Sequence, residues 1–284
     1  MKNTLIIYLF IVLSIQITQA RIRYVDKNGG TDQFGHQKYQ TIHAGIDAAI
    51  EGDTVRILPS IYNESITIGK NIVVQGGGLS TILTNDNGTV VSITSGKLMW
   101  VLVSGSTGNG IDASNCIISD CIISKCPLVG ISINGPNCKI FNSISIGNSF
   151  DGFSGNANTS LINCIAVSNR RYGFVAWSNT MNCKNCDSYG QLYDTWNYWG
   201  NITKIDCLAE DPGFSSDGQY RISLQSKCKD SGDPTIFDLD GTRSDMGYYG
   251  GPDAPLLPYV TTPQNFILNP DGSMQFNLTG KVGY

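Results

Sequence analysis

The chain has 284 residues and a formal net charge of −4, and only 15% of its residues are charged, against about 25% in typical soluble domains. The acidic balance argues against a nucleic-acid partner, because nucleic-acid surfaces need clustered positive charge. Glycine is abundant, with 32 residues, and this composition is typical of short strands joined by tight turns.

The first 20 residues have the features of a secretion signal. Lys2 supplies the positive start, residues 5–15 form an apolar run, and Thr18 and Ala20 are small residues at the expected cleavage positions. An apolar run of about 11 residues is too short to span a bilayer. We therefore predict a secreted chain that is extracellular, periplasmic or at the cell surface. We expect Arg21 to be its first residue and no membrane insertion once the signal is removed.

The next segment predicts the start of a β structure with one helix. Residues 23–26 read as a strand, and residues 44–50 read as an amphipathic helix that Gly52 ends. Its apolar face is expected to contain Ile42, Ile46, Ala49 and Ile50. We expect this helix to cover the open end of a solenoid. Further strands are expected at residues 54–58, 66–68, 72–74, 90–93 and 98–103.

A pattern of about 21 residues then repeats over residues 110–207. Equivalent positions in successive repeats form a column. The clearest column has spacings of 22, 21, 22 and 21 residues and contains Cys121, Ser143, Cys164, Cys186 and Cys207. Each of these follows an Asp or Asn, and a second column contains Gly110, Gly130, Gly152 and Gly173. Short runs of Ile and Val without helical spacing predict coils of three strands that pair in parallel, about 4.8 Å apart.

Stacking of the coils assigns a role to each column. The Asp/Asn column fits a tight turn, because these residues tolerate left-handed backbone. The glycine column is expected to mark a second bend with unusual torsions. The inward columns should align Cys138 with Thr159 and Met181, and most of the nine cysteines should be buried free thiols. Metal binding by Cys183 and Cys186 is not favoured, because the sequence has no second pair of this kind.

This repeat resembles the right-handed parallel β-helix proteins of the pectin-lyase-like superfamily. Tyr39-Gln40-Thr41-Ile42, Gly52-Asp53-Thr54-Val55 and the Asp240-Gly241-Thr242-Arg243 segment add to the resemblance, which covers residues 23–252. It implies an all-β solenoid over residues 21–252 with an N-terminal capping helix, followed by a linker and short tail over residues 253–284. Residues 211–224 resemble closing coils.

The resemblance implies a fold more than an activity, because the superfamily contains lyases, hydrolases, epimerases, adhesins and phage tailspikes. The catalytic signatures of its polygalacturonase-like hydrolases and calcium-dependent pectate lyases are missing from this sequence. Residues 238–245 hold several acids around a glycine. They suggest either a Ca²⁺ site or a salt-bridged turn around Arg243, and otherwise we expect no cofactor.

The resemblance also implies that extended polysaccharide binds along a lateral groove, so the turn before the glycine column is the candidate site. Its charged residues are Asp151, Arg170, Arg171 and Asp194. A lyase needs a cation and a base, which these arginines would supply. A hydrolase needs two carboxylates, and Asp151 and Asp194 are expected two coils apart, roughly 10 Å. The alternative is a solvated Asp–Arg–Asp ladder.

Aromatic residues near this turn suggest a platform for sugar rings. The predicted substrate-binding residues are Tyr172, Trp177, Tyr193 and Trp199. Trp177 and Trp199 are expected to stack, whereas Trp196 is expected to point inward. Ordinary core or loop packing of these rings is the alternative.

We therefore predict a secreted β-helix protein that binds or acts on polysaccharide, in the manner of a lyase or a glycosidase. The alternative is a non-catalytic surface or adhesin-like protein. The expected partner is a glycan, and the expected state is a monomer.

Overall fold

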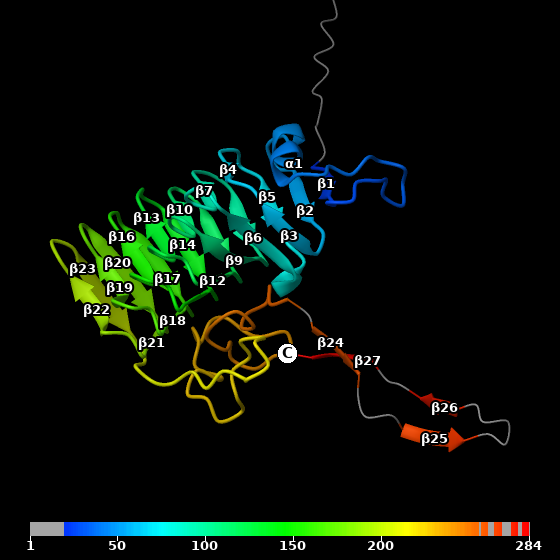
Figure 1. The fold of residues 1–284 in the computed structure, drawn as a ribbon. Coiled ribbons are helices and arrows are strands. Elements are labelled where there is room, and N and C mark those ends of the chain that lie inside the picture. Colours follow the sequence, from blue (N-terminus) through cyan, green and yellow to red (C-terminus); the bar gives the residue numbers. More distant parts are fainter. Residues whose placement is uncertain (1–19, 256, 261–263, 269–273, 278–279, 284) are drawn as a thin grey trace, which may run out of the picture.

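The structure is a computed structural model that describes residues 20–255, 257–260, 264–268, 274–277 and 280–283. Apart from Ala20, the predicted secretion signal lies outside the described residues. The chain forms a right-handed parallel β-helix of about seven turns, as predicted, and each turn contributes one strand to each of three parallel sheets (Figure 1).

The first sheet has nine strands. In order they are β1 (Ile22–Val25), β2 (Thr54–Ile57), β5 (Val73–Gln75), β8 (Lys97–Met99), β11 (Ile117–Ser119), β14 (Cys138–Phe141), β17 (Thr159–Ile162), β20 (Thr180–Lys184) and β23 (Asn201–Ile205). The second sheet has seven strands, β4 (Ile66–Ile68), β7 (Val91–Ile93), β10 (Ile111–Ala113), β13 (Ile131–Ile133), β16 (Phe153–Gly155), β19 (Tyr172–Ala176) and β22 (Tyr193–Asn197).

The third sheet also has seven strands, β3 (Ser60–Asn63), β6 (Thr81–Asn85), β9 (Leu102–Ser106), β12 (Ile122–Ser124), β15 (Ile144–Ile146), β18 (Ile165–Val167) and β21 (Asp187–Tyr189). A 3-10 turn, η1 (Gly78–Ser80), precedes β6. In the C-terminal tail β24 (Leu257–Val260) pairs with β27 (Gly280–Gly283), and β25 (Gln264–Leu268) pairs with β26 (Met274–Asn277), both antiparallel.

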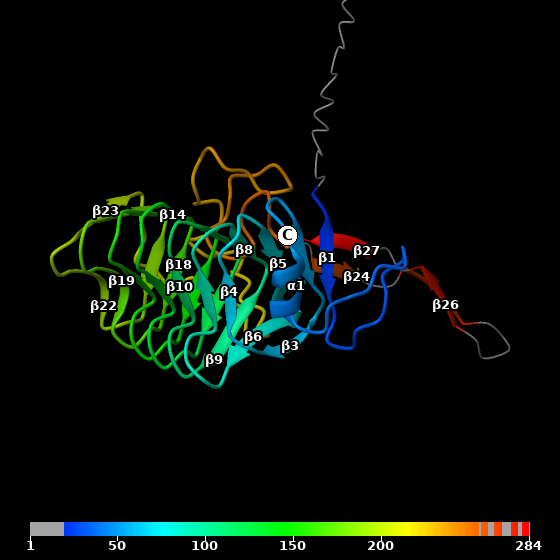
Figure 2. The same ribbon diagram turned by 90° about the horizontal axis from the view of Figure 1, so that it is seen from above.

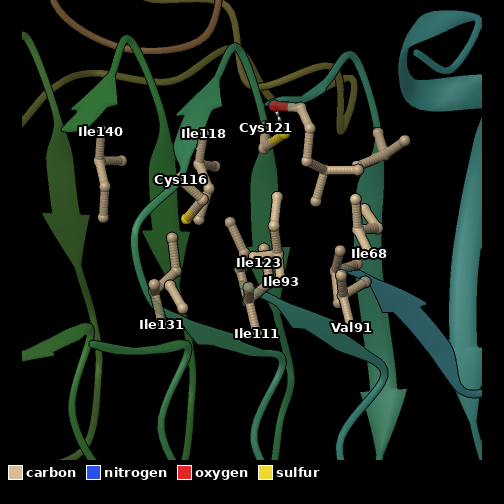
Figure 3. Close-up of a cluster of buried hydrophobic side chains, with 14 of the residues drawn as sticks. Ile68, Val91, Ile93, Ile111, Cys116, Ile118, Cys121, Ile123, Ile131 and Ile140 are labelled. Atoms are coloured by element: carbon tan, nitrogen blue, oxygen red, sulfur yellow. Dashed lines mark hydrogen bonds between the residues drawn. The ribbon is translucent and has the colours of Figure 1, made fainter. Parts of the chain in front are cut away.

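Equivalent residues lie above one another in the core. Cys138 pairs with Thr159 and Thr159 pairs with Met181, as the sequence predicts. Figure 3 shows the resulting ladders, in which Val91, Ile111 and Ile131 come from successive coils. All nine cysteines are free, and all are buried except the half-buried Cys207. The sulfurs therefore act as small apolar core groups, as predicted.

The Asp/Asn column adopts the predicted left-handed turn. Its φ values lie between 43° and 56° at Asp120, Asn142, Asn163, Asn185 and Asp206. Short polar side chains tolerate this conformation because they bond to nearby backbone groups. The turn therefore recurs once per coil and fixes the register of the solenoid.

The glycine column has a different cause from the one expected. Gly110, Gly130, Gly152 and Gly173 are not among the described residues with positive φ, so the predicted unusual torsions are wrong. A Cβ at Gly152 would instead lie 2.7 Å from the carbonyl oxygen of Gly173 and 2.8 Å from Nδ2 of Asn169. Glycine is required because the next coil passes too close for a side chain.

The one α-helix of the described residues, α1 (Ile42–Ala48), lies at the N-terminal end of the solenoid (Figures 1 and 2). It begins two residues earlier than predicted, because Thr41 caps it through a hydrogen bond from the Ala44 N–H. Ile42, Ile46 and Ala49 are buried as expected, but Ile50 is exposed. The carboxylate of Glu64 accepts hydrogen bonds from the N–H groups of Ile42 and His43.

The other end of this helix is held by a lysine rather than by Gly52. The C-cap is Ala49, and the ammonium of Lys70 donates to the carbonyls of Ile46, Asp47 and Ala49 at 2.8–2.9 Å. A cation at this position also complements the negative end of the helix dipole. The first regular coils therefore fix both ends of the cap. Among the described residues, no helix is long and apolar enough to cross a membrane.

Residues 206–255 follow the last coil and pack along the side of the solenoid (Figure 1). Residues 211–224, expected as closing coils, contain only an isolated bridge between Phe214 and Ile222. Asn163 anchors the segment, since it accepts from the Asp233 N–H at 2.6 Å and donates to Ser244 Oγ at 3.1 Å. The turn column therefore serves as a docking row for this segment.

Candidate functional site

The outward face of the second sheet carries a continuous ladder. One residue per coil projects outward in register, in the order Thr67, Ser92, Asp112, Ser132, Ser154, Val175 and Trp196. Strand side chains alternate between faces, so the intervening residues fill the core. The ladder is polar over its first five coils and becomes apolar over its last two.

An ion pair lies beside the apolar end of this ladder. The guanidinium of Arg171 donates from Nε to Asp151 Oδ1 at 2.9 Å and from Nη2 to Oδ2 at 2.8 Å. The Asp151 side chain is fully buried, whereas the Arg171 side chain is 31% exposed. The hydrogen bonds that Arg171 donates to Asp151 raise the pKa of Arg171. The arginine therefore stays protonated and presents a cation at the surface.

Aromatic rings surround this cation. Its guanidinium carbon lies 4.8 Å from the ring centre of Tyr172, 5.1 Å from that of Phe150 and 5.9 Å from that of Trp177. These distances are within the range of cation–π contacts. Asp151 therefore holds one edge of Arg171 while aromatic rings flank its faces.

A layer of outer rings extends the cluster over β22 and the turn that follows it. Trp177 and Tyr198 are stacked, with ring centres 3.8 Å apart and planes 5° from parallel. Trp196 stacks on Tyr172 at 5.5 Å and 13°. Tyr193 lies beside Trp196 at 5.1 Å, and Trp199 is 85% exposed.

We call this surface the aromatic face and define it by Phe150, Arg171, Tyr172, Trp177, Tyr193, Trp196, Tyr198 and Trp199. Five of its rings have exposures of 38% or more, namely Phe150, Tyr193, Trp196, Tyr198 and Trp199. Tyr172 is buried beneath the others, and its hydroxyl lies 3.4 Å from that of Tyr198. The hydrogen bond with Tyr198 raises the pKa of Tyr172 to about 12, so this hydroxyl remains protonated at neutral pH.

Two expectations about these rings are wrong. Trp196 does not point inward, because it pairs with Val175 in the outward ladder, while Thr195 pairs with the inward Phe174. The expectation placed Trp196 in the inward column of Phe174, one residue away from its true position. A shift of one residue along a strand moves a side chain to the opposite face of the sheet. Trp177 and Trp199 do not stack either, because the register of β19 and β22 places Trp177 opposite Tyr198, and Tyr198 is its partner ring.

The four charged residues of the candidate site are not equivalent. Tyr193 pairs with Tyr172, so Asp194 falls opposite Gly173 and ends the glycine column. No coil follows at this position, so a side chain has room there. Asp194 and Arg170 are exposed, and neither forms an ion pair within the described part of the chain. The expected Asp–Arg–Asp ladder is therefore reduced to the pair of Asp151 and Arg171.

Cavities are found elsewhere on the molecule. One of about 500 Å³ lies beside β1 and is lined by Arg21, Tyr24, Phe34 and His36, among others. Another, of about 310 Å³, lies at the end of the last coil beside Phe174, Lys204 and Cys207. An enclosed cavity suits a small molecule, whereas an extended polymer requires a long open surface. The aromatic face is an open surface of this kind, whereas Ser132, Ser154 and Val175 of the ladder are buried.

The acidic segment at residues 238–245 is organised by its backbone. Asp238 accepts from the Asp245 N–H, and Asp240 accepts from the N–H and hydroxyl of Thr242. Within the described residues no group of three or more His, Cys, Asp or Glu side chains could hold a metal ion. Arg243 bonds to the carbonyls of Ser231 and Gly232 instead of forming the expected salt bridge. The calcium site remains a prediction.

No protein-family model matches the chain, and no curated protein matches its sequence. Three solved structures are similar at low identity. A pectate lyase, Pel9A, is 13% identical over 82% of this chain and 97% of its own, with a TM-score of 0.42. A rhamnogalacturonan lyase is 14% identical over 70% and 64%, with a TM-score of 0.41. The periplasmic alginate epimerase AlgG is 12% identical over 59% and 54%, with a TM-score of 0.39.

Proposed function

We propose that this protein binds an extended polysaccharide, with the aromatic face as the principal contact. The observation that supports this most directly is the cluster of exposed rings around Arg171 on the last coils. Flat aromatic surfaces pack against the apolar faces of sugar rings, and a nearby cation and hydroxyls hydrogen-bond to sugar oxygens. A solvent-exposed cluster of this size needs a partner to explain it.

The outer rings have the properties that contact requires. Trp199 and Tyr193 are 85% and 47% exposed, and neither contributes to the buried core. Tyr198 and Trp177 are held parallel by stacking, so they present a preorganised plane. Preorganised groups lose little conformational entropy on binding, which favours affinity.

For Asp151 and Arg171 the geometry supports binding rather than proton transfer. The carboxylate of Asp151 is fully buried and both of its oxygens accept from Arg171. An acid or base must reach the proton that it transfers, and Arg171 holds its own proton tightly. We therefore propose that the pair positions a cation against the polysaccharide. Arg170 and Asp194 are exposed beside it, and we propose that they contact the same ligand.

The proposal is tested with purified protein and a panel that contains pectate, rhamnogalacturonan, alginate and neutral glucans. Affinity electrophoresis should show retardation by at least one polysaccharide. Trp196→Ala and Trp199→Ala should each weaken binding about tenfold, since one stacked ring contributes on the order of 1–1.5 kcal/mol. Phe34→Ala is the matched control, because Phe34 is 72% exposed but lies in the loop between β1 and α1.

Turnover is measured in the same samples through unsaturated products and new reducing ends. Product formation that Arg171→Ala abolishes, in a protein that still folds, would assign catalysis to this surface. Binding without product identifies a binding module. If no polysaccharide of the panel binds, or if the tryptophan variants bind as well as the Phe34→Ala control, the proposal is refuted.

A further inference from the structure

The backbone nitrogen of Arg21 lies in an unusual place. It donates a hydrogen bond of 2.8 Å to Oδ1 of Asp53, a carboxylate that is completely buried. Asp53 is positioned where α1 is followed by β2, beneath the capping helix. Its other partners are the N–H of Ile50 at 3.1 Å and Nε of Arg23 at 3.2 Å. The carboxylate therefore joins the N-terminal strand, the cap helix and the first coil.

Among the described residues, Arg21 is the first that hydrogen-bonds to the β-helix through its backbone. Its carbonyl accepts from the Thr54 N–H at 2.8 Å, and Ile22 then pairs with Thr54 in β1. Ala20 is exposed and belongs to no strand. Arg21 is also the residue that follows the predicted cleavage position between Ala20 and Arg21.

Cleavage at that bond changes the chemistry of this nitrogen. A peptide N–H is neutral, whereas the freed nitrogen is an α-ammonium with a full positive charge near neutral pH. Hydrolysis adds one water: the C–N bond breaks, the carbonyl carbon of Ala20 gains the water oxygen and becomes a carboxylate, and both protons of the water end on the nitrogen of Arg21, which becomes an ammonium. A second charged donor would then face Asp53. Among the groups that set the pKa of Asp53, only Arg23 is charged.

We propose that removal of residues 1–20 creates a structural ion pair between the new α-ammonium of Arg21 and the buried carboxylate of Asp53, which fastens the N-terminal cap only after processing. Charge-assisted hydrogen bonds are shorter and about twice as strong as neutral ones. The unprocessed chain keeps only the neutral bond. This inference is independent of the proposed polysaccharide binding.

The position of cleavage is decisive, because one residue of extended chain spans about 3.3–3.6 Å. A chain that starts at Ala20 carries its ammonium that far from the carboxylate, and a chain that starts at Ile22 lacks the donor altogether. Comparison of these chains with one that starts at Arg21 therefore isolates the ion pair from the general effect of a shorter terminus.

The experiment compares thermal unfolding at pH 6.5 of four forms: free Arg21, N-acetylated Arg21, free Ala20 and free Ile22. Free Arg21 should unfold about 2–4 °C higher than its acetylated form, and free Ala20 should resemble the acetylated form. The ion pair raises the folded pKa of the amine above its unfolded value of about 8. The difference should therefore be complete below pH 8 and disappear as the pH rises through the folded pKa.

Asp53→Asn should remove the difference between the free and acetylated forms. Since Asp53→Asn also disturbs the bonds to Ile50 and Arg23, a second readout uses the unaltered sequence. The α-amine of the Arg21 form should react with an acylating reagent at pH 7.5 at least tenfold more slowly than that of the Ala20 form. Equal melting temperatures of free and acetylated Arg21, or equal amine reactivity of the two forms, would overturn the proposal. Mass spectrometry of protein secreted with its own leader should show Arg21 as the first residue, and any other start would also contradict it.

Discussion

Arg171 holds the buried carboxylate of Asp151 through two parallel hydrogen bonds of 2.9 and 2.8 Å. The two partners differ in exposure, since Asp151 is fully buried and 31% of the Arg171 side chain reaches solvent. The pair crosses from one coil to the next and supports the rings of the aromatic face. It therefore couples the stability of the last coils to the shape of the proposed binding surface.

This asymmetry predicts unequal mutational costs. Arg171→Met leaves the buried carboxylate of Asp151 without a charged partner. Removal of one partner of a buried ion pair costs about 3–5 kcal/mol of folding stability. Because Arg171 is partly solvated, we expect the lower end, about 3 kcal/mol. Asp151→Asn leaves an arginine that water can reach, so its cost should be about 1 kcal/mol. Urea unfolding measures both.

The double variant Arg171→Met with Asp151→Asn provides the control. The double variant has no carboxylate at position 151. It should therefore recover at least half of the free energy of unfolding that Arg171→Met alone loses. Equal costs for the two single variants, or a double variant no more stable than Arg171→Met, would show that the pair is a weak surface contact.

The glycine column predicts a steric cost. A Cβ at Gly152 would lie 2.7 Å from the Gly173 carbonyl oxygen, and backbone of the next coil cannot move aside cheaply. Gly152→Ala should therefore destabilise the fold by about 2–3 kcal/mol, as overpacking does. Gly69→Ala is the control, because its Cβ would meet only Thr94 Oγ1 at 3.7 Å. Similar unfolding midpoints for the two variants would argue against close approach as the reason for this column.

Buried carboxyl groups predict that stability falls as the pH rises from about 5 to 8. Burial raises the pKa of Asp120 to about 8 and that of Asp187 and Asp245 to about 6, from 3.8. In this window the folded chain binds more protons than the unfolded chain, so higher pH favours unfolding. Asp120→Asn should keep the left-handed turn, because Asn occupies the equivalent position in other coils, as at Asn142 and Asn163.

That variant should flatten the upper part of the pH profile, between about pH 6 and 8, when melting temperatures are compared with those of the unchanged chain. Asp86→Asn, at an exposed position, should leave the profile as it is. A melting temperature that rises from pH 5 to pH 8 would show that Asp120 is ionised and stabilising in the folded state.

Much of the fold could be predicted because a stacked coil repeats the same physical demand at each turn. The columns through Cys164 and Asn163 are visible in the sequence, since each position must be small or must adopt a left-handed turn. The last coil could not be read in this way. Its aromatic residues lack successors, so the inward and outward registers of Trp196 were not distinguished.

The site was harder to predict for a related reason. A repeat reports which residues share a column, but not which side chains cross between columns. Whether Arg171 pairs with Asp151 or with Asp194 depends on its side-chain conformation at the end of the solenoid. The contribution of Tyr198 was missed because the register of β19 and β22, which places Tyr198 and not Trp199 opposite Trp177, was not recognised. That of Phe150 was missed because only the charged residues of its turn were considered. A local density of aromatic residues over 193–199 was the available signal.

Cys207 is predicted to be the one rapidly reactive thiol. It is half-buried, whereas the other eight cysteines are buried. A hydrogen bond from Cys186 lowers the pKa of Cys207 to about 7, and thiolates are the reactive form. A disulfide reagent at pH 7.5 should therefore modify one thiol in the folded protein and nine in urea. Cys207→Ser should remove the fast phase, and the column already accommodates Ser143. Several fast thiols in the native protein would contradict the buried column.

The most direct test of the binding surface uses tryptophan fluorescence. Three of the four tryptophans, Trp177, Trp196 and Trp199, belong to the aromatic face, and Trp100→Phe removes the fourth. A polysaccharide that binds there should shield these indoles, so acrylamide quenching should fall at least twofold as binding saturates. Unchanged quenching while the same polysaccharide is bound would place the binding site elsewhere on the molecule.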